Sequence, residues 1–95
     1  MEYLFIQRQG DRDQILNWYD QLKLLSKSAL VDRYNQVVQL GIVGSHAQAQ
    51  MIVAMHHVFI TVFGQSPIVI QDNVLLQLSS HIVLQGEQWQ FITNN

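Results

Sequence analysis

The chain has 95 residues, of which 48% are hydrophobic, and it contains no cysteine. A chain of this length builds one hydrophobic core, so we expect a single domain spanning residues 1–95. The absence of cysteine excludes disulfide frameworks, thiolate metal sites and cysteine nucleophiles within this sequence, and it fits a reducing cytoplasm.

The formal net charge of −2 conceals an uneven distribution of charged residues. All five cations lie in the first third, and residues 34–95 contain no Lys or Arg and two acids, Asp72 and Glu87. Nucleic-acid binding depends on Lys and Arg side chains that neutralise phosphates. The last two thirds of the chain cannot supply such a basic face, so the sequence argues against DNA or RNA as a partner.

No segment is predicted to cross a membrane or to direct secretion. The longest apolar run, residues 51–62, contains His56 and His57 and is shorter than the roughly 20 residues that a spanning helix requires. The first residues include an acid and a short apolar run, whereas a signal peptide has a basic start and roughly 7 to 15 apolar residues. We therefore expect a cytoplasmic protein without a membrane partner.

The first half of the chain predicts a short strand and two amphipathic helices. Residues 3–7 are aromatic and β-branched and stop before Gly10, which is typical of a strand. Apolar residues then recur at three- and four-residue spacing over residues 12–25 and again over residues 28–40. The serines at 26 and 28 and the glycine at 41 mark the start and the end of the second helix.

Residues 45–63 predict a buried central helix. Ser45 can cap its start and Gly64 can end it, and residues 51–63 hold only three polar side chains. Gly41 and Gly44 suit a tight turn before this helix. The turn lacks the lysine and the glycine spacing of a phosphate-binding loop.

Residues 66–85 are ambiguous. The alternation of Ile68 and Ile70 favours an extended segment, although the Ser-Pro pair before them can also start a helix. Residues 74–80 fit both the strand and the helix period, and a cap at Asp72 or Asn73 shifts our prediction toward helix.

The C-terminal prediction is clearer, because residues 82–92 alternate on either side of Gly86 and Glu87, as in a β-hairpin. We therefore predict a small α+β domain with three helices, a short N-terminal strand and a C-terminal β-hairpin. The alternative is an all-α domain with a C-terminal hairpin, in which residues 67–85 are helical.

Four polar residues share one stripe of the central helix. At 100° per residue, His46, Gln50, His57 and Thr61 fall within about 60° of one another. The stripe either meets solvent or lines a polar pocket, which makes these residues candidates for ligand binding or an interface. His56 falls among apolar neighbours, so we expect a buried hydrogen bond to satisfy it.

The spacing of the histidines argues against a metal site on this helix. His46 and His57 are eleven residues apart, which places them roughly 16 Å apart along the axis. His56 and His57 diverge by about 100°, whereas helical metal ligands use a spacing of three or four residues. We predict no metal ion and no cofactor.

Trp89 and Phe91 are the second pair of candidate interface residues. In an extended strand their side chains point to the same side. This aromatic side either packs on the helices or meets a partner.

The sequence contains no pattern of acids, serines or histidines that predicts a reaction. The serines at element ends fall in no nucleophile elbow, and Asp72 and Glu87 read as a cap and a turn residue. We therefore expect a protein-interaction or regulatory module without catalysis, which either forms a homodimer or binds a dedicated protein partner. The alternative is a small ligand-binding domain or enzyme that uses the polar stripe.

Overall fold

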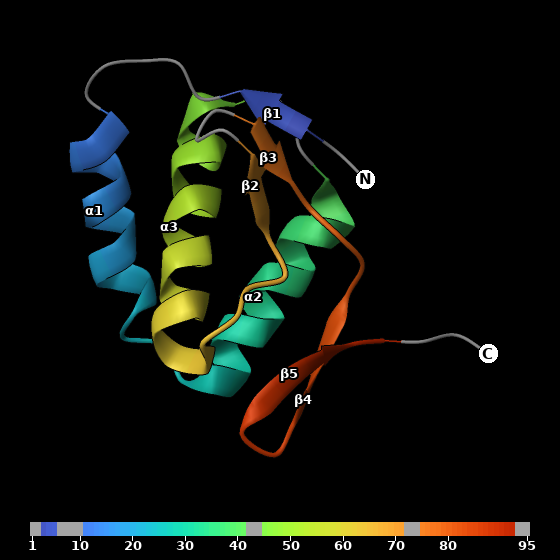
Figure 1. The fold of residues 1–95 in the computed structure, drawn as a ribbon. Coiled ribbons are helices and arrows are strands. Elements are labelled where there is room, and N and C mark those ends of the chain that lie inside the picture. Colours follow the sequence, from blue (N-terminus) through green and yellow to red (C-terminus); the bar gives the residue numbers. More distant parts are fainter. Residues whose placement is uncertain (1–2, 6–10, 42–44, 72–74, 93–95) are drawn as a thin grey trace.

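The computed structural model describes residues 3–5, 11–41, 45–71 and 75–92 of the chain. It shows the predicted α+β fold, with three helices, a short N-terminal strand and a C-terminal hairpin (Figure 1). The elements are β1 (Tyr3–Phe5), α1 (Asp11–Leu22), α2 (Lys27–Leu40), α3 (His46–Phe63), β2 (Val69–Gln71), β3 (Leu75–Gln77), β4 (Ile82–Gln85) and β5 (Gln88–Phe91).

Helix α3 is the centre of the core, as its apolar sequence predicts. The Ser45 hydroxyl accepts a hydrogen bond from the N–H of Gln48, and Gly64 ends the helix in the left-handed conformation with φ +81°. Half of the helix residues are buried, among them Ile52, Met55 and Phe59. Within the described chain, no helix combines the length and the apolarity needed to cross a bilayer.

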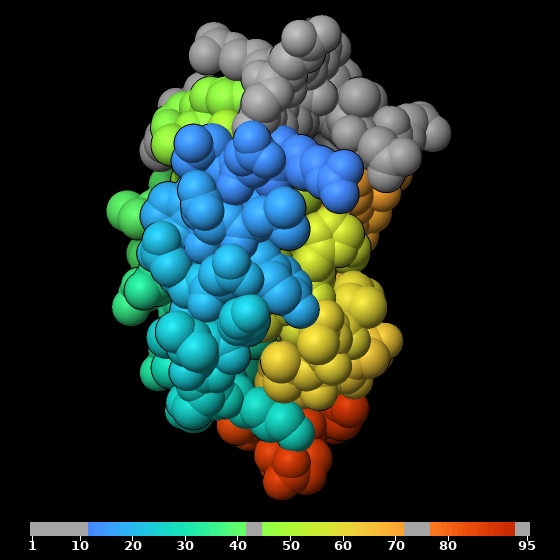
Figure 2. Space-filling view, turned by 90° about the vertical axis from the view of Figure 1, so that its left-hand side faces the viewer, coloured from blue at the N-terminus to red at the C-terminus, as the bar shows by residue number. Residues whose placement is uncertain are grey.

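Helix α1 packs along α3, and α2 joins the same core through its buried side chains. Figure 2 shows α1 lying over one face of the molecule, with the C-terminal part of α3 reaching the surface beside it. The Ser26 hydroxyl caps α2 by accepting from the N–H of Ala29, and Gly41 follows its last residue. The predicted caps at Ser26, Ser45 and Gly64 are therefore confirmed, whereas Gly44 lies outside the described residues.

The segment that the sequence left ambiguous forms strands. Strand β3 lies between β1 and β2 in a three-stranded antiparallel sheet, with Leu76 opposite Leu4 on one side and Ile70 on the other. The preference for helix over residues 74–80 was therefore wrong, and so was the all-α alternative. The two periods fit this sequence equally well, and two flanking strands decide the outcome because they supply hydrogen-bond partners for both edges of β3. The predicted caps at Asp72 and Asn73 lie outside the described residues.

Strands β4 and β5 form a separate two-stranded sheet that packs beside α2 (Figure 1). Gln85 pairs with Gln88 across a two-residue turn, in which Gly86 adopts φ +64°, a conformation that a glycine accepts without strain. Lys27 at the start of α2 binds the turn through a 2.6 Å ion pair with Glu87. Glu87 is thus a turn residue, as its position predicts.

Tyr34 ties α2 to the connection between β3 and β4. Its ring is fully buried and meets Phe59 edge-on at 5.9 Å between centroids. Its hydroxyl donates to the C=O of Ser80 and accepts from the N–H of Ser79, each at 3.2 Å. Burial raises the pKa of Tyr34 to about 12, although the Ser79 N–H acts in the opposite direction.

Replacing Tyr34 by Phe should lower the free energy of unfolding by about 1 to 3 kcal/mol, because the change leaves two backbone groups without their partner inside the protein. Chemical denaturation measures this difference. The matched control is Tyr19→Phe, since the Tyr19 hydroxyl bonds Thr61 at an exposed position. The control should cost less than about 1 kcal/mol, and equal losses in the two variants would contradict the anchoring role of Tyr34.

Candidate functional site

Asn35 joins α2 to the outer edge of the hairpin. Its side-chain Nδ2 donates to the C=O of Ile82, and its Oδ1 accepts from the N–H of Ile82, each at 2.8 Å. A neighbouring strand would bind the same two backbone groups in the same way. The amide of Asn35 therefore takes the place of a strand at this position of β4.

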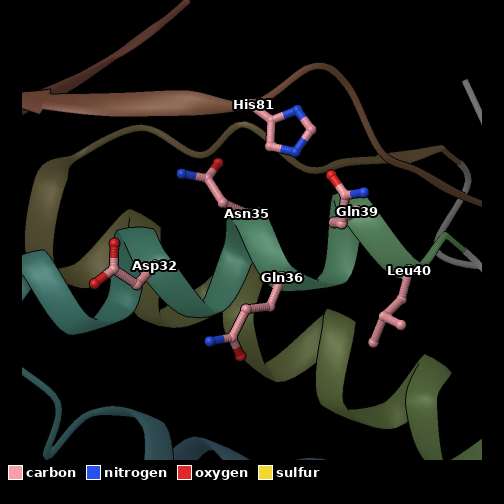
Figure 3. Close-up of a pocket in the computed structure, with 6 residues that line it drawn as sticks. All are labelled: Asp32, Asn35, Gln36, Gln39, Leu40 and His81. Carbon is pink, nitrogen blue, oxygen red and sulfur yellow. The ribbon is translucent and has the colours of Figure 1, made fainter.

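A shallow pocket of about 580 Å³ opens on the outer side of α2 next to this contact. Figure 3 shows Asn35 and Gln39 extending from α2 toward His81, whereas Gln36 and Leu40 extend from the opposite flank of the helix. The lining residues that belong to α2 recur at three- and four-residue spacing, so the α-helical repeat brings them to one surface of the helix. Leu40 is 77% exposed although it is aliphatic.

A second pocket of about 390 Å³ continues the first toward the hairpin. Asp32 and Asn35 line both pockets, so the two pockets adjoin along α2, and we treat them together as one depression. Exposed aliphatic side chains of β4 and of the residue after β5, Val83 and Ile92, line its second end. We call this depression the α2 trough; its walls are formed by Ser28, Val31, Asp32, Asn35, Gln36, Gln39, Leu40, His81, Ile82, Val83, Leu84 and Ile92.

The α2 trough offers binding groups rather than a reaction centre. The side chains of Asp32, Gln36 and Gln39 make no hydrogen bond or ion pair with the described part of the chain, so their donors and acceptors are available to a ligand. Asp32 and His81 form no ion pair with each other, which leaves no oriented acid–base pair. Among the described residues, no three His, Asp or Glu side chains converge as metal ligands.

The polar stripe of α3 is divided between the interior and the surface. Gln50 is only 9% exposed, whereas His57 and Thr61 are exposed and His46 is half-buried. Thr61 donates to the C=O of His57 and is also within 3.1 Å of the Tyr19 hydroxyl on α1. None of the three pockets that the structure describes is lined by a member of the stripe, and a role for these residues stays a prediction.

His56 has the partner that its apolar surroundings predict. Its Nδ1 lies 3.0 Å from the C=O of Ile68, so the Nδ1–H donates a hydrogen bond to the segment before β2. Burial lowers the pKa of His56 below its ordinary value of 6.5, and the adjacent His57 lowers it further, while the bond to Ile68 opposes both effects. The neutral ring is therefore the form that this position favours.

Trp89 and Phe91 share one side of β5, but they differ in burial. Trp89 is 6% exposed, donates through Nε1 to the C=O of Gln65 at 3.0 Å, and meets the Phe59 ring edge-on. Phe91 packs edge-on against Trp89 at 5.0 Å between centroids and remains 41% exposed. Trp89 thus packs on the helices, and Phe91 is the part of the predicted pair that a partner can reach.

The α2 trough was not predicted from the sequence, because the candidate residues predicted there lie on the central helix and in the hairpin. One signal was present: Leu40 is an aliphatic residue outside the apolar face of its helix, and amide residues surround it. The other half of the trough comes from His81, Val83 and Ile92, and tertiary contacts such as that between Asn35 and Ile82 bring these residues to α2.

Comparison of the chain with protein-family models, with curated proteins and with solved structures finds no match.

Replacing Asn35 by Ala should lower the free energy of unfolding by about 1 to 2 kcal/mol, because both backbone groups of Ile82 lose their partner. Amide hydrogen exchange should also become faster at Ile82, since its N–H then faces solvent. Gln36→Ala is the control, because Gln36 is the exposed neighbour on the same helix. Unchanged exchange at Ile82 in Asn35→Ala would refute the strand-like role of this amide.

The protein should lose stability as the pH falls below about 6.5, because an unfolded histidine with its ordinary pKa binds a proton that folded His56 resists. The loss levels off once the pH is below the lowered pKa of folded His56. An NMR titration should give His56 a midpoint below 6.5. His57→Gln should raise this midpoint, since it removes a neighbouring positive charge, whereas His81→Gln should not; a midpoint at or above 6.5 in the unmodified protein would contradict the assignment.

Proposed function

We propose that this protein is a non-catalytic interaction module whose α2 trough binds an extended segment of a protein partner. The observation that carries the proposal is that two open pockets adjoin along α2 and share Asp32 and Asn35, which gives an elongated surface rather than a closed cavity. Small-molecule sites are concave and bury most of their ligand, and an open trough fits a segment of chain better.

The chemistry of the trough indicates what the partner carries. Asp32 lines both pockets and forms no ion pair within the described part of the chain. Exposed aliphatic groups lie at the two ends, with Leu40 at one and Val83 and Ile92 at the other. A partner segment with one Lys or Arg between apolar side chains matches this order, and the amides of Gln36 and Gln39 can bind its backbone.

The proposal places the protein in the cytoplasm, because a chain without cysteine needs no oxidising compartment. The competing function, ligand binding or catalysis through the polar stripe, has less support. Gln50 is buried, Thr61 bonds Tyr19, and no described pocket reaches the stripe.

A photo-crosslinking residue, p-benzoylphenylalanine, tests the trough in cells that produce the full chain. At position Gln39 it should give one discrete protein adduct, whose partner is identified by mass spectrometry. At position Gln21 it should give none, although Gln21 also lines a surface pocket, of about 430 Å³, on α1. Absence of an adduct at Gln39, or the same adducts at both positions, would argue against the trough as the binding surface.

The identified partner then allows a binding measurement by calorimetry. Leu40→Glu should weaken binding at least tenfold, because it places a charge at an apolar contact. Leu16→Glu is the matched control, since Leu16 is also an exposed leucine but lies on α1. Asp32→Asn should reduce the salt dependence of binding, because it removes the charge that we pair with the partner. Equal affinities for the Leu40 and Leu16 variants would count against the proposal.

A further inference from the structure

The two edges of the hairpin differ in whether their outward backbone N–H and C=O groups can pair with another strand. In an antiparallel pair, alternate residues direct their N–H and C=O groups away from the partner strand. On β4 these residues are Ile82 and Leu84, given that Val83 pairs with Gln90. Asn35 already binds both groups of Ile82. The outer edge of β4 is therefore closed at this position.

The outer edge of β5 is open. The N–H of Ile92 bonds the C=O of His81, so Ile92 and Gln90 face β4, and the backbone groups of Trp89 and Phe91 point away from it. No backbone hydrogen bond within the described part of the chain uses these groups. Strand β5 reads QWQF and carries no charge, no proline and no bulge, three features that protect a strand edge from pairing.

We infer that β5 pairs antiparallel with β5 of a second copy of this chain, about a two-fold axis at Gln90. In this register Trp89 of one copy lies opposite Phe91 of the other. Each outward N–H of these two residues then donates to an outward C=O of the other copy. The two hairpins join into one four-stranded sheet.

The composition of β5 favours a copy of itself as the occupant. The strand has no charged residue, so the two-fold axis brings no like charges together. Gln90 faces Gln90 across the axis, and an amide side chain can both donate to and accept from another amide. The pairing also covers the part of the Phe91 ring that is exposed in one copy, because Trp89 of the second copy lies across from it on the same side of the sheet.

The contact is one short strand long, so the dimer should dissociate on dilution. This inference is independent of the proposed partner, because Gln90 is not part of the α2 trough. A failure of strand pairing therefore leaves the crosslinking results at Gln39 unaffected, and the reverse also holds.

A single cysteine tests the register, since the chain has no other. Residues at the two-fold axis form a pair without hydrogen bonds, whose Cα atoms lie about 4.5 Å apart, within the range of a disulfide. Gln90→Cys should therefore give a covalent dimer on mild oxidation. Gln85→Cys is the control, because Gln85 is an exposed glutamine of the same hairpin on β4. No covalent dimer from Gln90→Cys, or equal yields from the two variants, would overturn the inference.

Sedimentation equilibrium with charge variants tests the same axis without a covalent bond. The unmodified chain should associate reversibly, whereas Gln90→Lys and Gln90→Glu should each be monomeric because like charges meet at the axis. An equimolar mixture of the two variants should associate again, and Gln85→Lys should behave as the unmodified chain does. A monomeric unmodified chain at millimolar concentration, or a mixture that does not associate, would overturn the inference. Circular dichroism of each variant verifies that the fold is retained.

Discussion

Two neighbouring residues of α2, Tyr34 and Asn35, hold the C-terminal part of the chain in place. Together they make four hydrogen bonds to backbone groups of Ser79, Ser80 and Ile82. Consecutive helix residues diverge by about 100°, so one side chain can enter the core while the other reaches along the surface. The buried hydroxyl fixes the connection after β3, and the surface amide fixes the start of β4. The hairpin, the α2 trough and the open edge of β5 all depend on this arrangement.

The hairpin is further fixed at its other end by contacts with the end of α3. Trp89 and Gln88 donate to the carbonyl groups of Gln65 and Phe63, and Lys27 binds Glu87 while its ammonium lies over the Phe63 ring. The bond from Gln88 uses a carbonyl group that the end of the helix leaves unsatisfied. With both ends held, the hairpin presents a rigid edge, and a rigid edge loses little conformational entropy when a second strand pairs with it.

The scarcity of charged side chains after residue 33 connects both proposed interactions. Charged side chains on exposed faces keep proteins apart and protect strand edges. In this chain glutamine and asparagine occupy many such positions, including Gln36, Gln39 and Gln90. Amide side chains keep a surface soluble, yet removing them from water costs less free energy than removing charged groups. They can also both donate hydrogen bonds to backbone groups and accept them. The same composition that argues against nucleic acid as a partner therefore favours protein surfaces.

The sequence by itself determined the three helices, the caps of α2 and α3, and the hairpin, because hydrophobic period, serine caps and glycine turns are local signals. It also determined that His56 needs a buried partner. Tertiary structure decided that residues 75–77 form a strand, since the helix and strand periods coincide there and β1 comes from the far end of the chain. It decided that Gln50 is buried while His57 is exposed, because a helical stripe shows which residues align but not what covers them. The α2 trough was likewise beyond the sequence, since Asn35 and Ile82 are far apart in the chain and only packing joins them.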